Sequence, residues 1–199
     1  MARPPLRQRI LITGASSGLG AGMARRFAAR GRDLALVARR LDRLEALRDE
    51  LVTRHPGLRV TVAPLDVDDP DAVAEVVPRL ATELGGLDRF IANAGLGKGT
   101  PIGSGHPRPN RQVLVTNVLG PRLLAHPWHP GHHIHPGFIA TDINLGRRGP
   151  FTVDLQTGVT ALTAAVEREP VRAYVPEWPW RPVAGLLRAL PLPLVRRLA

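Results

Sequence analysis

Over the first 92 residues, short stretches of consecutive apolar residues alternate with longer segments whose apolar residues recur every three or four positions. Consecutive apolar residues are typical of strands that are buried on both faces, and the longer recurrence is typical of amphipathic helices. The predicted strands are residues 9–13, 33–38, 58–63 and 87–92. The predicted helices are residues 19–30, 41–53 and 69–84. Asp69 and Pro70 favour a helix start, whereas Gly31 and Gly85 favour helix ends.

This alternation predicts an α/β fold in which helices cover both faces of a parallel sheet. Right-handed crossovers then give the spatial strand order 3-2-1-4, which is one half of a Rossmann-type, doubly wound dinucleotide-binding fold. Ligands bind at the carboxyl ends of the strands in such sheets. The candidate motifs of this sequence all follow predicted strands.

Glycines are concentrated in the turn after the first strand, Thr13-Gly14-Ala15-Ser16-Ser17-Gly18-Leu19-Gly20. The spacing is G-x-x-x-G-x-G rather than the common G-x-G-x-x-G. Glycine lets the backbone turn tightly and approach a pyrophosphate, which then lies on the amide groups of the next helix. We therefore expect a dinucleotide to contact this turn at Gly14, Ser16, Ser17, Gly18, Leu19 and Gly20.

The end of the second strand indicates which nicotinamide cofactor is favoured. An NAD site places Asp or Glu there to hold the ribose 2′-hydroxyl, whereas this chain has Arg39 and Arg40. A guanidinium binds a 2′-phosphate through paired, charge-assisted hydrogen bonds, and a carboxylate would repel it. NADP(H) is therefore the predicted cofactor. The alternative is that Arg39 only begins a helix on a solvated face.

Four further motifs follow in order along the chain. They are Leu65-Asp66-Val67, Ile91-Ala92-Asn93-Ala94-Gly95, Thr116-Asn117-Val118 and Pro136-Gly137-Phe138-Ile139-Ala140-Thr141. Together with the glycine-rich turn, they make the sequence resemble the short-chain dehydrogenase/reductase family. The resemblance covers residues 8–124 and resumes near Ile134.

The resemblance implies a role for each of these motifs. It puts Asp66 and Val67 beside the adenine, and it makes Asn117 the asparagine of the catalytic tetrad. It also implies contacts with the cofactor groove or its nicotinamide end for Asn93, Ala94, Gly95, Pro136, Gly137, Ile139 and Thr141. The implied activity is NADP(H)-dependent hydride transfer to or from a carbonyl or alcohol carbon.

The sequence departs from the family in its catalytic residues. The family uses a serine after the fifth strand and a Tyr-x-x-x-Lys pair on the next helix, in which tyrosine exchanges the proton and lysine lowers the tyrosine pKa. Here the only tyrosine is Tyr174 and the only lysine is Lys98, so the pair is absent. Outside the glycine-rich turn the only serine is Ser104. We therefore expect an internally deleted member in which strands five and six are largely missing.

Residues 125–135 form a junction rich in histidine and proline. Histidines at this spacing could bind zinc or nickel, but no Cys, Asp or Glu lies among them, so we predict no metal site. An alternative origin is a reading-frame slip, because codons for His-Pro-Gly-His-His read one base over can encode Thr-Pro-Val-Thr-Thr. Residues 97–109 and 126–135 are expected to be poorly ordered.

The C-terminal remnant, residues 136–199, is predicted to contain a helix at 154–169 and a strand at 171–175. That strand could lie against the fourth strand, giving the order 3-2-1-4-7. The tail is apolar with interspersed arginines, and its prolines at 182, 191 and 193 are expected to interrupt any long helix. Packing against the sheet or a partner subunit is the favoured role of the tail, and contact with an anionic membrane is the alternative.

The composition narrows the class of protein. A chain of 199 residues suits a single domain, here divided into a dinucleotide-binding half (8–124), the junction (125–135) and the remnant (136–199). Without cysteine there are no disulfides and no thiolate sites. The net charge of +10 is carried almost entirely by arginine, and no nucleic-acid-binding motif accompanies it. The N-terminus lacks the apolar region of a secretory signal, so we expect a cytoplasmic protein.

Two functional hypotheses follow. In the first, the chain is by descent an NADP(H)-dependent oxidoreductase whose catalysis is lost or severely impaired. In the second, it is a non-catalytic NADP(H)-binding module, either a cofactor sensor or the partner of an intact paralogue, and a homo-oligomer is a further possible assembly. A defective gene product is a third reading, and the substrate is not predicted.

Overall fold

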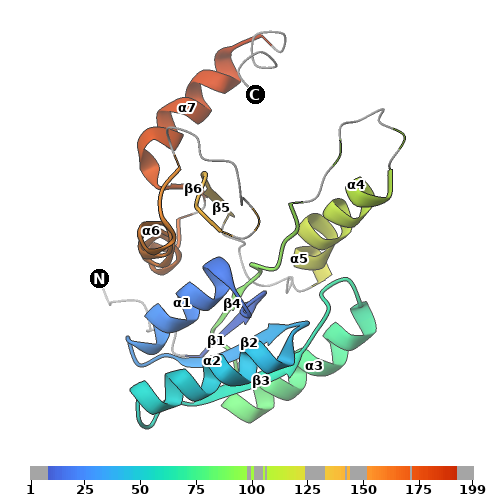
Figure 1. The fold of residues 1–199 in the computed structure, drawn as a ribbon, viewed down its shortest axis with the longest axis vertical. Helices are drawn as coiled ribbons and strands as arrows, with labels where there is room; N and C mark the ends of the chain where they lie inside the picture. The colour runs from blue at the N-terminus through green and yellow to red at the C-terminus, as the bar shows by residue number, and fades with distance from the viewer. Residues whose placement is uncertain are drawn as a thin grey trace. The chain divides into compact units, whose positions relative to one another are not determined.

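The computed structural model describes residues 9–97, 100, 105, 107–123, 133–141, 143, 152–170 and 172–191 (Figure 1). Contacts between residues divide the chain into two compact units. The first unit comprises residues 1–129 and 141–143, and the second comprises residues 130–140 and 144–199. Residues 141–143 thus belong to the first unit, although the sequence predicted them as part of the segment 136–199.

The first unit contains a four-stranded parallel sheet in the order β3-β2-β1-β4, as predicted. Its strands are β1 (Arg9–Thr13), β2 (Asp33–Ala38), β3 (Val60–Pro64) and β4 (Arg89–Ile91). The two central strands are almost wholly buried, which explains their consecutive apolar residues. The carboxyl ends of all four strands meet at one edge of the sheet.

Three helices connect these strands, namely α1 (Gly18–Ala28), α2 (Leu41–Arg54) and α3 (Pro70–Leu84). The predicted signals for α3 are confirmed: the Asp69 side chain accepts hydrogen bonds from the backbone amides of Asp71 and Ala72, and Gly85 ends the helix with φ 76°. The predicted and observed bounds of the strands and helices in this unit differ by two residues at most.

Helices cover both faces of the sheet (Figure 1). Alternate residues of the central strands, including Leu11, Ala35 and Val37, pack with the buried residues of α3. Because successive side chains of a strand point to opposite faces, their neighbours point the other way, and those neighbours are also buried: Ile10, Ile12, Leu34 and Leu36.

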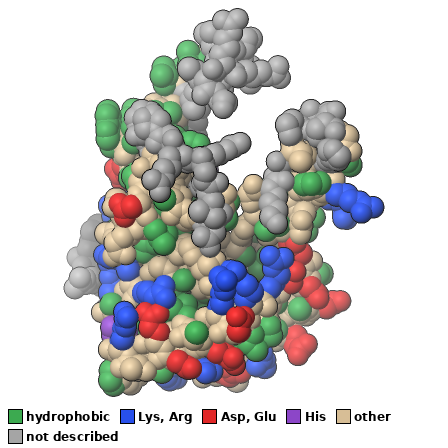
Figure 2. Space-filling model, viewed as in Figure 1, with side chains coloured by type: hydrophobic (Ala, Val, Ile, Leu, Met, Phe, Trp, Pro, Cys, Tyr) green, Lys and Arg blue, Asp and Glu red, His purple; other side chains and the backbone are tan. Residues whose placement is uncertain are grey.

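Ion pairs join the exposed parts of the first unit. Arg59 pairs with Asp33 at 2.7 Å, and Arg9 pairs with Asp88 at 2.7 Å. On the face shown in Figure 2, basic and acidic side chains are interspersed over this unit. The net positive charge of the chain is therefore not gathered into a single patch on that face.

Strand β4 lies at one edge of the sheet and is only half-buried. Among the described residues, it pairs with β1 alone. After it come α4 (Pro107–Leu114), a π-helical turn (η1, Val115–Leu119) and α5 (Gly120–Leu123). Three large apolar side chains on these helices are exposed: Leu114, Val118 and Leu119.

The second unit contains a two-stranded parallel sheet of β5 (His133–Pro136) and β6 (Arg172–Val175), with α6 (Leu155–Arg168) and α7 (Glu177–Ala189). The suggested order 3-2-1-4-7 is therefore wrong, because the C-terminal strand pairs with β5. Four residue pairs in register and a hydrogen bond from the Gly137 amide to the Val175 carbonyl at 2.8 Å fix this pairing.

Two other expectations are corrected in part. Residues 107–109 are helical and residues 133–135 form a strand, although both segments were expected to be poorly ordered. The other parts of those segments lie largely outside the described residues, as does most of the 125–135 junction. Helix α7 contains Pro182, because this proline follows the non-helical Trp178 closely and so lies near the helix start, where a missing amide costs little.

No helix within the described ranges is long and apolar enough to cross a membrane. The described residues also contain no cluster of three or more histidine, aspartate or glutamate side chains suited to a metal ion.

Candidate functional site

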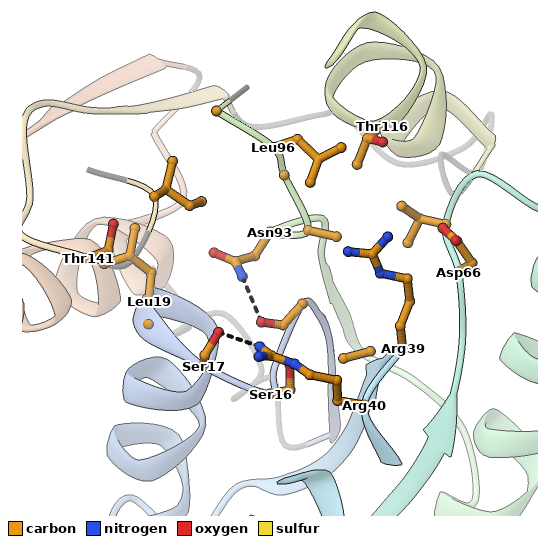
Figure 3. A pocket seen from close by; sticks show the side chains of 18 of the residues that line it. Ser16, Ser17, Leu19, Arg39, Arg40, Asp66, Asn93, Leu96, Thr116 and Thr141 are labelled. Carbon is orange, nitrogen blue, oxygen red and sulfur yellow. Dashed lines mark hydrogen bonds between the residues drawn. The ribbon is translucent and has the colours of Figure 1, made fainter. Parts of the chain in front are cut away.

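A pocket of about 490 Å³ opens at the carboxyl ends of the four strands of the first unit (Figure 3). Small-molecule and cofactor sites have volumes of about 300–1,000 Å³, so the pocket is large enough for such a ligand. The residues that line it all belong to the first unit: Gly14, Ser16, Ser17, Gly18, Leu19, Ala38, Arg39, Arg40, Leu65, Asp66, Val67, Asn93, Ala94, Gly95, Leu96, Gly97, Thr116, Thr141 and Ile143.

The glycine-rich turn forms the floor of the pocket, and two of its glycines are required by geometry. Gly14 has φ 66°, and a Cβ there would lie 2.8 Å from the Cα of Ala94. Gly20 lies on the first turn of α1, where a Cβ would overlap the carbonyl group of Gly14. Because neither residue has a side chain, α1 packs closely against the end of β1, and the helix begins directly at the pocket.

Thr13 and Asn93 tie the ends of β1 and β4 together. The Thr13 hydroxyl oxygen accepts hydrogen bonds from the amides of Asn93 and Ala94, both at 3.0 Å. The Asn93 side chain donates to the Thr13 carbonyl at 3.0 Å. The pocket wall after β4 is therefore held to the floor by hydrogen bonds between residues 80 positions apart in the sequence.

The start of α1 is suited to an anion. No acidic residue lies in its first turn, and no side chain caps it at Ser17. Its first backbone amides are therefore not satisfied by a cap, and the helix dipole favours negative charge there.

Two arginines follow β2 at the same end of the pocket. One Arg40 nitrogen donates to the Ser16 and Ser17 hydroxyls at 3.0 and 2.9 Å. Arg39 extends into the pocket on the side of Asp66 (Figure 3). The two guanidinium groups thus give this end of the pocket a positive charge.

Polar contacts also hold the pocket wall formed by the segments after β3 and β4. The Asp66 side chain accepts from the Asp68 amide at 3.1 Å, and the Thr116 hydroxyl donates to the Asp68 carboxylate at 2.7 Å. Asn117, on the π-helical turn, accepts from the Leu96 amide at 2.8 Å and donates to the Leu96 carbonyl at 2.9 Å. Asn117 therefore fixes the pocket wall at Leu96 without lining the pocket itself.

A match to a family model agrees with these features. They are the glycine-rich turn after β1, the parallel 3-2-1-4 sheet and the pocket at its carboxyl edge. The model for "short chain dehydrogenase" matches residues 8–130, more than half of the chain. The chain belongs to the short-chain dehydrogenase family.

Curated relatives include an uncharacterized oxidoreductase of Mycobacterium tuberculosis, 40% identical over 247 residues, which cover 97% of this chain and 98% of the relative. Sulfoacetaldehyde reductase of Chromohalobacter salexigens is 38% identical over 138 residues, covering 69% of this chain and 53% of that protein.

Solved structures share the fold. An alcohol dehydrogenase from Comamonas testosteroni, specific for bulky-bulky ketones, has a TM-score of 0.73 at 23% identity, covering 92% of this chain and 91% of that chain. A short-chain dehydrogenase from Sphingobium yanoikuyae in complex with NADPH has a TM-score of 0.72 at 23% identity, covering 91% and 94%.

The structure brings together thirteen of the seventeen residues that the sequence predicts as cofactor contacts. These thirteen line the pocket: Gly14, Ser16, Ser17, Gly18, Leu19, Arg39, Arg40, Asp66, Val67, Asn93, Ala94, Gly95 and Thr141. Their contact with a cofactor stays a prediction.

The other four lie elsewhere. Gly20 packs beneath the turn, against Gly14. Pro136, Gly137 and Ile139 belong to the second unit, where Ile139 is only 1% exposed.

Six pocket residues were not predicted from the sequence: Ala38, Leu65, Leu96, Gly97, Thr116 and Ile143. Five are direct neighbours of a predicted residue or of one another, and Ile143 follows Thr141 by two positions. Leu65 and Thr116 already lie within the quoted motifs, and extending the motifs that end at Gly95 and Thr141 by two residues would have found Leu96, Gly97 and Ile143.

The single tyrosine, the single lysine and the one serine outside the glycine-rich turn were not predicted to be catalytic. Tyr174 is on β6, where its ring stacks on His135 at a centroid distance of 5.3 Å. Lys98 and Ser104 lie outside the described residues.

Proposed function

We propose that this chain is an NADP(H)-binding member of the short-chain dehydrogenase family that has lost the residues for proton transfer. By descent it is an oxidoreductase for a carbonyl or alcohol, and its hydride transfer is absent or severely impaired. Its dinucleotide-binding half is the first unit. The observation that carries the proposal is a pocket lined by the glycine-rich turn and two arginines, in a chain without a Tyr-x-x-x-Lys pair.

The pocket residues fit NADP(H). The amides at the start of α1 would hold the pyrophosphate, and Arg39 and Arg40 would hold the 2′-phosphate together with the Ser16 and Ser17 hydroxyls. Asp66 and Val67 would lie beside the adenine. When bound, the nicotinamide ring is the group that gives or takes hydride in this family. The NADPH present in the Sphingobium dehydrogenase of the same fold supports this cofactor.

The length of the mycobacterial alignment supports an internal deletion. That alignment has 247 residues, whereas this chain has 199, so at least 48 aligned positions (247 minus 199) have no residue here. Because 97% of this chain and 98% of the relative are covered, the missing positions are internal rather than terminal. A segment of this size would include the strand and helix that carry the catalytic serine, tyrosine and lysine in the family.

Loss of the tyrosine removes the acid that protonates the developing alkoxide. General acid–base catalysis typically contributes a factor of about 10²–10⁴. Asn117 matches the remaining residue of the tetrad, but its side-chain amide is bonded to the Leu96 backbone. It therefore acts as a positioning residue for the pocket wall.

A non-catalytic partner role is the second candidate. The exposed side chains of Leu114, Val118 and Leu119 on the helices after β4 favour it, since such a surface suits a partner subunit.

If the 125–135 junction is a reading-frame scar, resequencing the gene will reveal a different base count there.

The proposal is tested by thermal unfolding with and without cofactor, followed by far-ultraviolet circular dichroism. A ligand that binds only the folded state stabilises it, by about 2.7 kcal/mol at a hundredfold excess over Kd. We expect NADPH to raise the melting temperature more than NADH does. We also expect no NADPH oxidation above background with a panel of aldehydes and ketones. If neither cofactor raises the melting temperature, the proposed cofactor binding is wrong. If NADPH is oxidised rapidly with any of these carbonyl compounds, the proposed loss of catalysis is wrong.

The Arg39→Gln variant tests whether Arg39 binds the 2′-phosphate. A hydrogen bond to a charged group contributes about 1.5–3 kcal/mol, so we expect NADPH affinity to fall by about tenfold or more while NADH affinity changes little. Arg43→Gln is the matched control, because Arg43 is an exposed arginine on α2 that does not line the pocket. Equal losses in both variants would mean that general charge, not Arg39, attracts the phosphate.

A further inference from the structure

Two asparagines on the helices after β4 bind the backbone of the segment that precedes these helices. Asn117 accepts from the Leu96 amide at 2.8 Å and donates to the Leu96 carbonyl at 2.9 Å. Asn110, on α4, makes the same pair of bonds with Thr100: it accepts from the amide at 2.7 Å and donates to the carbonyl at 2.9 Å. We refer to these four hydrogen bonds as the clasp.

The spacing of the two asparagines suits the clasp. They are seven residues apart, which is two helical turns to within about 20°, so both lie on one side of the helix. Seven residues rise about 10.5 Å along an α-helix, whereas the four residues from Leu96 to Thr100 reach about 13 Å when extended. The segment is therefore long enough to pass both asparagines, and it meets Asn117 first, opposite to the direction of the helix.

Hydrogen bonding rather than burial joins α4 to the segment after β4. None of the residues of α4, Pro107–Leu114, is buried, so the helix has no apolar contact of the kind that fixes α1 or α3. An asparagine amide is suited to this task, because it carries a donor and an acceptor side by side and can bond to both backbone groups of one residue.

The segment held by the clasp includes part of the pocket wall. Leu96 and Gly97 line the pocket, and Ile143 packs so closely on Gly97 that a Cβ there would overlap its side chain. The sequence has a second glycine at position 99, and glycine restricts the backbone least of all residues. A wall with this much backbone freedom keeps one position only if it is fixed on both sides, as the clasp does.

We infer that Asn110 is a positioning residue for the pocket: through Thr100, it fixes the wall formed by Leu96 and Gly97 before a ligand binds. Asn110 does not line the pocket, and it lies outside every motif that carries the family resemblance. The inference rests on the proposed NADP(H) site, because NADPH is the ligand used to measure its effect. Coupling of this kind is reciprocal, so a ligand that the wall stabilises also stabilises the clasp.

Two variants at Asn110 and one control, all made in the full chain, test the inference. Asn110→Leu removes both hydrogen bonds, and Asn110→Gln keeps a donor and an acceptor. Gln112→Leu is the matched control, because Gln112 is an exposed amide on the same helix that does not line the pocket. The Kd of NADPH is measured by calorimetric titration below the melting temperature of every variant.

We expect Asn110→Leu to raise the Kd of NADPH about fivefold or more, since coupling between sites typically changes affinity by at least that factor. Asn110→Gln should bind NADPH more tightly than Asn110→Leu does. The control should change the Kd by less than about twofold, as is usual for a surface substitution.

Hydrogen exchange provides a readout that a general loss of stability would not produce. In the absence of ligand, Asn110→Leu should speed exchange in peptides covering residues 93–100 and leave peptides covering β2 and β3 unchanged. In the wild-type chain, NADPH should slow exchange in residues 107–114, because ligand and clasp stabilise each other. In Asn110→Leu this protection of α4 should be lost.

The remaining outcomes separate this inference from the proposed function. If exchange over residues 93–100 quickens while the Kd is unchanged, the inference fails and the proposed cofactor site stands. The inference also fails if the control weakens binding as much as Asn110→Leu, or if Asn110→Gln binds no better than Asn110→Leu. If the wild-type chain binds no NADPH, the proposed site is wrong. Exchange over residues 93–97 then decides the inference alone, and an unchanged rate in Asn110→Leu overturns it.

Discussion

At the scale of single residues, two glycines in helices differ in the space that surrounds their Cα atoms. Gly20 lies in α1, where a Cβ would overlap the Gly14 backbone beneath the pocket. Gly185 lies in α7, where a Cβ would meet nothing within 4 Å. The sequence motif singles out Gly20, but only the neighbouring backbone shows that a side chain there has no room whereas one at Gly185 does.

We therefore predict opposite signs for two alanine substitutions. Gly20→Ala forces the turn and helix apart, which typically costs about 1–3 kcal/mol, and it should also abolish NADPH binding. Gly185→Ala should stabilise the chain by roughly 0.5–1 kcal/mol, since alanine loses less backbone entropy in a helix. Urea unfolding measures both. A stable Gly20→Ala chain with normal binding would contradict the close approach seen between these two glycines.

At the scale of elements, local caps and ion pairs set where helices begin and how they join. Asp69 is the N-cap of α3 and accepts two backbone hydrogen bonds, at 3.1 and 3.0 Å. The Arg25 guanidinium on α1 donates hydrogen bonds of 2.6–3.1 Å to the Glu50 carboxylate on α2. The first interaction is readable from sequence, because cap and helix are adjacent. The second joins residues 25 positions apart and is visible only in the fold.

Removing the Asp69 cap should destabilise the first unit. We expect Asp69→Ala to lower the free energy of unfolding by about 1 kcal/mol, because two amides at the start of α3 lose their acceptor. Asp69→Asn keeps an acceptor oxygen and should lose much less. Equal losses in the two variants, measured by chemical denaturation, would show that charge rather than capping matters at this position.

The Arg25–Glu50 pair should make stability depend on pH in the acidic range. The hydrogen bond from Arg25 lowers the pKa of Glu50 below its ordinary value, and the positive charge of Arg25 acts in the same direction. A carboxyl whose pKa is lowered by folding stabilises the fold above its unfolded pKa, and this contribution disappears as pH falls through the folded pKa.

The measurement compares the wild-type chain with Glu50→Gln from neutral to acidic pH. Because the pair is partly exposed, its contribution at neutral pH should be below about 1 kcal/mol. The two unfolding curves should converge once the carboxylate is protonated. A gap that persists or widens in acid would argue against the ion pair as its source.

At the scale of the whole molecule, the chain divides into two compact units. The pocket is lined by the first unit alone, and the second unit uses its Gly137–Ile139 segment for internal packing. A ligand in the pocket should therefore rigidify one unit and leave the other unchanged.

Hydrogen exchange read by mass spectrometry will test this division. On adding NADPH, we expect slower exchange in peptides containing Gly14–Gly20 and Asn93–Gly97, which line or support the pocket. Peptides covering β5 and β6 should exchange at the same rate with and without NADPH. Protection of β5 by NADPH would show that this segment takes part in binding.

Much of this protein was determined by sequence alone. The strand order, the Asp69 cap and the glycine-rich turn follow from periodicities and signals within a few residues of one another, so local physics specifies them. The same holds for the arginines after β2, because parallel strands bring their carboxyl ends to one edge. The absence of a Tyr-x-x-x-Lys pair is likewise a property of the sequence.

Tertiary structure decided the rest. The pairing of β5 with β6, the cover of Trp180 over Gly137 and the bonding of Asn117 to Leu96 all join residues more than 20 positions apart. No periodicity encodes such contacts, because each depends on which surfaces remain available once the rest of the chain has packed. The sequence motif predicts a cofactor contact for Ile139, and only the tertiary structure shows that its side chain is buried within the second unit.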